Sequence, residues 1–144
     1  MFHESNSNYF KIMARKKIKK EVRKKIWAKY GFRCAYCGEN IAYQDMQIDH
    51  IIPHRNFTNI KKELNKKKKV IDYGIDSYKN LNPACRVCNH WKGVWSIEEF
   101  RHEIQMQTIR VPENTSGFRL ALKYGLVKIH KRKKVKFFFE TYKG

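Results

Sequence analysis

Two Cys-x-x-Cys pairs constrain what this chain can fold into more than any other feature. Cys34 and Cys37 form the first pair, and Cys85 and Cys88 form the second, with residues 38–84 between them. A gap of two residues lets one tight turn present both sulfurs, and four thiolates satisfy a tetrahedral Zn²⁺ ion. Two disulfides are the alternative, but residues 1–10 lack the apolar core of a secretory signal, and cytosolic thiols stay reduced. We therefore expect a cytoplasmic protein with a structural zinc site.

The zinc site would be closed, because four cysteines complete the coordination and leave no position for Lewis-acid chemistry. Its expected task is to hold the turn at residues 32–38 against a segment at residues 85–92. A chain of 144 residues has the length of one domain, and a small core gains from such a staple. We expect a single domain at residues 15–144, with its core at about 20–95 and a C-terminal extension at 96–144. Residues 1–14 are expected to be a flexible extension.

The charge of the chain points to a polyanionic partner. The sequence has 32 Lys and Arg residues against 13 Asp and Glu residues. The basic residues concentrate in segments 11–33, 61–69 and 128–136. Nucleic acid is the commonest partner of so basic a protein, and contacts from Lys and Arg to phosphates give affinity and orientation without sequence information. No run of 18 apolar residues predicts a membrane span.

Helices are predicted from apolar spacing and from capping signals. The apolar residues Ile18, Val22, Ile26 and Tyr30 recur every four positions, which predicts an amphipathic helix at residues 16–30. Ser96 and Glu99 have the spacing of a capping box. Further helices are predicted at residues 85–94, from Ser96 towards Thr108 with an end before Pro112, and at residues 118–124.

Strands and loops complete an α+β prediction. Residues 41–43 and 46–48 are predicted to form a β-hairpin, with Pro53 ending the second strand segment. A second hairpin is predicted to pair residues 126–130 with 135–140. Residues 55–79 are polar and rich in lysine, and we expect a long loop there with a helical turn near residues 60–64. Loops of this length in small domains often carry function.

Three motifs, in this order and spacing, resemble the HNH endonucleases, also called the ββα-metal or His-Me finger family. The motifs are Cys34-Ala-Tyr-Cys37-Gly38, then Asp49-His50-Ile51-Ile52-Pro53, then Asn80-Leu81-Asn-Pro83-Ala-Cys85-Arg-Val-Cys88-Asn89-His-Trp-Lys92-Gly93. The resemblance covers about residues 20–95. It implies a small ββα-metal core within the α+β fold and an activity on double-stranded DNA.

The resemblance also assigns roles to individual residues. Hydrolysis of a phosphodiester needs an activated water, a cation on the developing charge and a stabilised leaving oxygen. By resemblance His50 is the general base, Asp49 and Asn89 are the metal ligands, and Asn80 braces the His50 loop. The triad is then the variant His50, Asn80 and Asn89. Two oxygen ligands favour Mg²⁺ or Mn²⁺ over Zn²⁺ at this second site.

The sequence leaves some of these assignments open. His90 is an alternative to Asn89 as the metal ligand, and only one of them can face the metal because adjacent helical residues point about 100° apart. Lys92 matches a frequent family lysine and is a candidate phosphate contact, although a plain surface lysine would give the same pattern. His54 and Arg55 are further candidates for nucleic-acid binding.

The sequence therefore predicts a Mg²⁺-dependent DNA endonuclease of the HNH type, such as a restriction, phage or mobile-element nuclease. A zinc-stabilised nucleic-acid-binding protein without catalysis is the alternative, and a ribosome-associated RNA-binding protein is a third reading. Cleavage of both DNA strands by a chain this small would imply a homodimer or sequential nicking.

Overall fold

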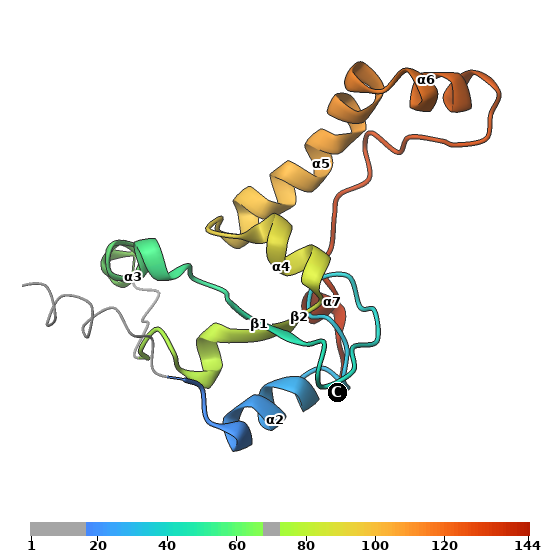
Figure 1. Cartoon of the computed structure of the whole chain (residues 1–144). Coiled ribbons are helices and arrows are strands. Elements are labelled where there is room, and N and C mark those ends of the chain that lie inside the picture. The colour runs from blue at the N-terminus through green and yellow to red at the C-terminus, as the bar shows by residue number, and fades with distance from the viewer. Residues whose placement is uncertain (1–16, 68–72) are drawn as a thin grey trace, which may run out of the picture.

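The fold is a small α+β core from which a helical arm, formed by α5 (Ile97–Asn114) and α6 (Ser116–Lys123), projects (Figure 1). The computed structural model describes residues 17–67 and 73–144, so the extension expected at residues 1–14 lies outside the described residues. Along the chain come α2 (Lys20–Ala28), β1 (Gln47–His50), α3 (Phe57–Lys66), β2 (Leu81–Ala84), α4 (Arg86–Lys92), α5 (Ile97–Asn114), α6 (Ser116–Lys123) and α7 (Phe138–Thr141). Single 3-10 turns at His54–Asn56 and Tyr78–Asn80 precede α3 and β2.

The sheet consists of β1 and β2, which run antiparallel with Gln47 opposite Ala84 and His50 opposite Leu81. The hairpin predicted within residues 41–48 is therefore wrong, because the partner of β1 comes from a distant part of the chain. Pro83 in β2 obscured this pairing, since proline lacks an N–H and is tolerated only at sheet edges. Its carbonyl accepts a hydrogen bond from the Ala35 N–H at 2.8 Å, which joins the sheet to the first cysteine turn.

The main core lies between α2, the sheet, α5 and the C-terminal segment. Ile26 of α2, Met46, Leu81, Phe100 of α5 and Phe137 are all buried in it. The helix predicted at residues 16–30 is confirmed over Lys20–Ala28, with its apolar residues facing this core. The core therefore fixes the two strands, because both strands contribute residues to it.

Three helices predicted from the sequence are confirmed after β2. The second cysteine pair lies at the start of α4, with Cys85 as its N-cap and Cys88 in its first turn. The capping box of α5 is present, since Ser96 Oγ accepts from the Glu99 N–H at 3.3 Å and Glu99 Oε2 accepts from the Ser96 N–H at 2.7 Å. The helix predicted at residues 118–124 corresponds to α6.

The end predicted for α5 is wrong, because the helix continues through Pro112 to Asn114. A proline in the last turn removes one helical hydrogen bond, and the helix extends only two residues beyond it. The Arg119 guanidinium donates to the carbonyls of Pro112 and Glu113 at 2.8 and 2.9 Å. These bonds satisfy carbonyls that the end of a helix leaves without partners.

The predicted C-terminal hairpin is also wrong. Residues 126–137 form no strand, and the chain instead returns along α5 towards the core, as the orange and red trace in Figure 1 shows. The Phe138 and Phe139 N–H groups donate to the carbonyls of Tyr36 and Ala35 at 2.9 and 2.8 Å. The apolar run at 137–139 thus pairs with the first cysteine turn rather than with residues 126–130.

Residues 55–79 contain more regular structure than the sequence predicted. A full helix, α3, replaces the expected single helical turn. Phe57 is buried against Ile52, and the partly buried residues Ile60, Leu64, Tyr73 and Ile75 pack around this pair. A second small apolar cluster therefore fixes α3 beside the end of β1. In the parts of the chain that the structure describes, no helix has both the length and the apolar character to cross a bilayer.

Candidate active site and metal centre

The four cysteine sulfurs meet at one point beside the sheet. The Sγ atoms of Cys34, Cys37, Cys85 and Cys88 all lie within 4.8 Å of one another. Cys37 Sγ and Cys85 Sγ are 3.9 Å apart, far beyond the roughly 2.05 Å of a disulfide. That separation is close to the edge of a tetrahedron built on Zn–S bonds of about 2.3 Å. The cluster is therefore a candidate metal centre, as the sequence spacing predicted.

The proton affinities of these thiols diverge because they interact strongly. The pKa of Cys34 is lowered to about 5, first because the Cys88 thiol hydrogen-bonds to it and then because backbone groups do so. The pKa of Cys37 is raised to about 11, mainly by burial. The pKa of Cys88 is also raised, chiefly because its thiol is bonded to Cys34. Closely spaced thiolates repel one another, and a bound divalent cation removes that repulsion.

A second site lies at the end of β1. Asp49, His50 and Asn89 line one open hollow of about 320 Å³, between the end of β1 and the face of α4. The hollow is also lined by Pro53, His54 and Arg55. His90 is exposed at the adjacent position of α4. Among the two alternatives left open by the sequence, Asn89 is therefore the residue that shares a hollow with Asp49 and His50.

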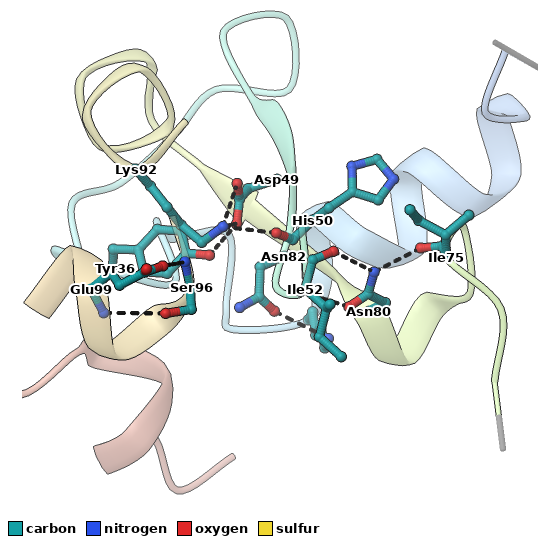
Figure 2. Close-up of polar contacts among 11 residues, drawn as sticks. Tyr36, Asp49, His50, Ile52, Ile75, Asn80, Asn82, Lys92, Ser96 and Glu99 are labelled. Carbon is teal, nitrogen blue, oxygen red and sulfur yellow. Dashed lines mark hydrogen bonds and ion pairs between the residues drawn. The ribbon is translucent and has the colours of Figure 1, made fainter. Parts of the chain in front are cut away.

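Asp49 is held from two sides by residues of distant segments (Figure 2). Its side chain is 4% exposed, and the Tyr36 hydroxyl donates to its Oδ2 atom. Lys92 Nζ lies 3.2 Å from Asp49 Oδ1 and 3.1 Å from Oδ2. The same ammonium donates to the His50 carbonyl at 2.8 Å. The end of β1 is thus fixed by the first cysteine turn and by the last residue of α4.

Lys92 does not lie where a phosphate-binding lysine would lie. The sequence left it as a candidate phosphate contact or a plain surface lysine, but its side chain is 0% exposed. Only its pairing with the buried carboxylate makes this placement tolerable, since an unpaired charge is costly to bury. In the structure, Lys92 therefore holds Asp49 and His50 in place through the Asp49 carboxylate and the His50 carbonyl.

Burial shifts the proton affinities around Asp49. The pKa of Asp49 is raised by desolvation, and the charge of Lys92 and the bonds from Tyr36 and Lys92 oppose that rise. The pKa of Lys92 is lowered by the same burial, and the charge and hydrogen bond of Asp49 oppose that decrease. The pKa of Tyr36 is raised, first by desolvation and then by the Asp49 charge, so its hydroxyl remains a donor at neutral pH.

Asn80 closes the base of the segment that follows β1. Its Oδ1 atom accepts from the Ile52 N–H at 2.9 Å, and its Nδ2 atom donates to the Ile52 carbonyl at 3.2 Å and to the Ile75 carbonyl at 2.8 Å (Figure 2). The Ile51 N–H donates to the Asn80 carbonyl at 2.8 Å. The side chain is fully buried, so these bonds are shielded from water. The chain directly after His50 is therefore fixed by Asn80.

Sequence reasoning missed one polar contact of His50. Its Nε2 atom lies 2.8 Å from Asp76 Oδ1, and the Asp76 side chain is 54% exposed. No motif marks Asp76, which lies in a segment with weak periodicity, so nothing in the sequence pointed to this pair. A carboxylate in this position favours the tautomer that carries its proton on Nε2 and leaves the Nδ1 lone pair available.

The donors around the hollow suit a hard cation. A carboxylate offers about four lone pairs, and hydrogen bonds from Tyr36 and Lys92 use two of those on Asp49. Lone pairs of Asp49 therefore remain for a metal, and Asn89 adds an amide oxygen from the same hollow. Oxygen ligands of this kind suit Mg²⁺ or Mn²⁺.

Comparison with known families agrees with this geometry. The sequence model described as HNH endonuclease matches residues 34–94, which run from the first cysteine through β1, β2 and α4 to the residue after Gly93. No curated protein matches the chain in sequence. The matched range contains both cysteine pairs and every residue expected to hold the metal or to act as the base. Residues 34–94 of this chain are therefore similar to the HNH endonuclease domain.

Proposed function

We propose that this chain is a metal-dependent endonuclease that hydrolyses phosphodiester bonds in double-stranded DNA. The observation that carries the proposal is the shared hollow of Asp49, His50 and Asn89, within a domain whose family acts on DNA. The hollow is open to solvent on a strongly basic chain, so a phosphate backbone can approach it.

His50 acts as the general base in this proposal. Its Nε2 atom is engaged by Asp76, so Nδ1 takes the proton from the attacking water. Lys92 binds the His50 carbonyl, and Asn80 fixes the backbone that follows. The backbone of His50 is thus held on both sides, which keeps the imidazole at one position relative to the phosphate.

Asp49 and Asn89 would hold the catalytic cation, Mg²⁺ or Mn²⁺. When bound, that ion would stabilise the charge on the phosphate and on the leaving 3′ oxygen. Tyr36 and Lys92 hold the Asp49 carboxylate in place for this task. His54 and Arg55 are exposed at the rim of the hollow and would contact the scissile strand.

We also infer that the four cysteines hold a structural Zn²⁺. The metal would join the first cysteine turn to the N-terminus of α4, because each element supplies two of the sulfurs. Asn89 follows Cys88 directly, and Tyr36 lies between Cys34 and Cys37. The zinc would therefore position residues on both sides of Asp49 without taking part in the reaction.

A zinc-stabilised nucleic-acid-binding protein without catalysis is the competing function. The engagement of both Asp49 oxygens by Lys92 favours this alternative, because it reduces the charge that the carboxylate offers to a cation. The two functions share the zinc site and the basic surface, so only a test of bond cleavage separates them.

Supercoiled plasmid with Mg²⁺ or Mn²⁺ provides that test. The wild-type chain is expected to nick or linearise the plasmid, and His50→Ala and Asn89→Ala are expected to lose at least 100-fold in rate. His90→Ala is the matched control on the neighbouring residue and should retain activity. Plasmid binding without cleavage by the wild-type chain would overturn the endonuclease proposal and leave the binding protein.

Gel electrophoresis of the products of this plasmid reaction addresses the mode of cleavage and the biological role. Direct linearisation would support a homodimer, and accumulation of nicked circles would support single-strand action by a monomer. Discrete fragments from a larger DNA would support a restriction or homing role, because such enzymes read base edges. A smear of fragments would support a nuclease of low specificity.

A further inference from the structure

A second concave surface lies outside the domain matched by the HNH family. It is a groove of about 660 Å³ between α5 and the segment at residues 130–136 that returns from α6 towards the core (Figure 1). Ile104 and Thr108 line it from α5, and Val135 lines it from the returning segment. We call this feature the arm groove.

The remaining wall of the arm groove is almost entirely basic. Lys131, Lys133, Lys134 and Lys136 line it together with His130, and no carboxylate is among its lining residues. All four lysines are exposed, and none of them forms an ion pair with another residue in the described ranges 17–67 and 73–144. These charges are therefore available to a ligand.

Glu140 does not neutralise the groove. Glu140 feels the charge of Lys134, but its carboxylate is bound by the Arg101 guanidinium, with Arg101 Nη1 at 3.0 Å from Glu140 Oε2. Arg101 also donates to the carbonyl of Val135 and so fixes the returning segment against α5. The wall that carries the lysines is thus held in place by a buried arginine.

We propose that the arm groove binds the sugar-phosphate backbone of duplex DNA away from the bond that is cut. Exposed lysines are mobile point charges that suit phosphates, and the groove has no acid to repel them. The groove shares no lining residue with the hollow at Asp49 and His50, so a duplex held in it would be contacted away from the bond that is cut. This inference rests on the proposed DNA substrate.

The role expected for the arm groove is affinity and orientation. Phosphate contacts carry no sequence information, so a change in the groove should alter binding to all duplexes alike. The hollow at Asp49 and His50 shares no lining residue with the groove. Loss of the groove charges should therefore leave the rate at saturating DNA unchanged.

The test measures binding of the full-length zinc-loaded chain to a fluorescent duplex by anisotropy, without Mg²⁺ and over a series of salt concentrations. The variant replaces Lys131, Lys133, Lys134 and Lys136 with Gln. The matched control replaces four exposed lysines at or near α2, namely Lys19, Lys20, Lys24 and Lys25, with Gln. Both variants lose the same charge, so the comparison separates the groove from net charge.

The groove variant is expected to weaken binding about 100-fold near 0.1 M salt, and to reduce the slope of log affinity against log salt by about 3.6, or 0.9 per lost contact. The control is expected to change both quantities much less. Equal losses in both variants, or no loss in the groove variant, would overturn the proposal. A loss of binding to an RNA duplex or an acidic peptide, with DNA binding intact, would overturn it in favour of that partner.

Two further measurements keep the test decisive. If the fourfold variant is less stable in thermal unfolding, the pairs Lys131/Lys133 and Lys134/Lys136 are changed separately, and each is expected to remove about half of the slope change. Because binding is measured without cleavage, a chain that binds through the groove but never cuts DNA would support the groove and refute the nuclease. A groove variant that binds and cuts DNA normally would refute the groove and support the nuclease.

Discussion

The pair of Asp49 and Lys92 joins two residues that are 43 positions apart and almost without exposure to water. Sequence spacing placed Asp49 at the end of a strand and Lys92 at the end of a helix, but it could not show that the two meet. The contact depends on how α4 packs against β1, which is a property of the folded chain. Asp76 was beyond prediction for the same reason, since its contact with His50 comes from the return of a distant segment.

Removal of the Lys92 charge should destabilise the protein strongly. Lys92→Met leaves the Asp49 carboxylate buried without its cation, and we expect a loss of about 3 kcal/mol in the free energy of unfolding. The double variant Lys92→Met/Asp49→Asn leaves no buried charge and should recover part of that loss. Urea unfolding at fixed zinc concentration measures both. A double variant no more stable than the single one would show that packing, not charge, dominates.

Loss of the Asp76 carboxylate should slow catalysis without weakening DNA binding. Asp76→Asn removes the charged partner of His50 Nε2, and we expect kcat to fall about 10- to 100-fold with KM unchanged. Asp45→Asn removes a charge from an exposed turn and serves as the control. The ¹⁵N chemical shifts of His50 should report a change of tautomer in the Asp76 variant alone. An unchanged kcat would exclude Asp76 from the reaction.

Elements set by local signals were predicted well, and elements set by distant partners were not. The α2 helix follows from apolar spacing, and the start of α5 follows from the Ser96 and Glu99 capping box. The two predicted hairpins failed because β1 pairs with β2 across 30 residues, and because residues 137–139 bond to the first cysteine turn. Local pattern identifies a strand-like segment, but it does not identify the partner of that segment.

The C-terminal element depends on the bond between Arg101 of α5 and Glu140 of α7. Arg101 lowers the pKa of Glu140 below its ordinary value of 4.5 by hydrogen bonding. A lowered carboxyl pKa means that the folded state holds the charged form, so the stabilisation is complete above pH 4.5. It is then lost as the pH falls through the lowered pKa.

Glu140→Gln is therefore expected to reduce stability at pH 7 by about 2 kcal/mol and to flatten the loss of stability below pH 4.5. Thermal or urea unfolding between pH 3 and pH 7 measures this difference. Glu113→Gln removes an exposed carboxylate and should leave the pH profile as in the wild-type chain. Parallel pH profiles for wild type and Glu140→Gln would contradict the assignment.

At the scale of the whole molecule, the cysteine cluster is the point where three parts of the chain meet. The first cysteine turn carries Tyr36, the start of α4 follows Cys85, and the segment at 137–139 bonds to the carbonyls of Ala35 and Tyr36. The sequence predicted this cluster of cysteines because the two Cys-x-x-Cys pairs are recognisable from local spacing. It could not predict that the C-terminal segment would complete the same junction.

Removal of zinc is expected to unfold the core and not only the cysteine turn. A zinc-selective chelator should lower the melting temperature by more than 10 °C and abolish cleavage even when Mg²⁺ is in excess. One equivalent of Zn²⁺ per chain should restore both. Cys37→Ser changes the exposed cysteine and is expected to weaken zinc retention without a new packing defect. An unchanged melting temperature after chelation would refute a structural metal.

The clamp formed by Asn80 has a consequence for engineering. Because its side chain bonds to Ile52 and to Ile75, the chain that leaves β1 and the chain that enters β2 are tied together at one point. Segments whose two ends meet at a rigid base can be exchanged for others of different length with little effect on what lies below. The stretch between these ends therefore forms a natural cassette. Libraries built there would vary the surroundings of the hollow at Asp49 and His50 while leaving the cysteine cluster unchanged.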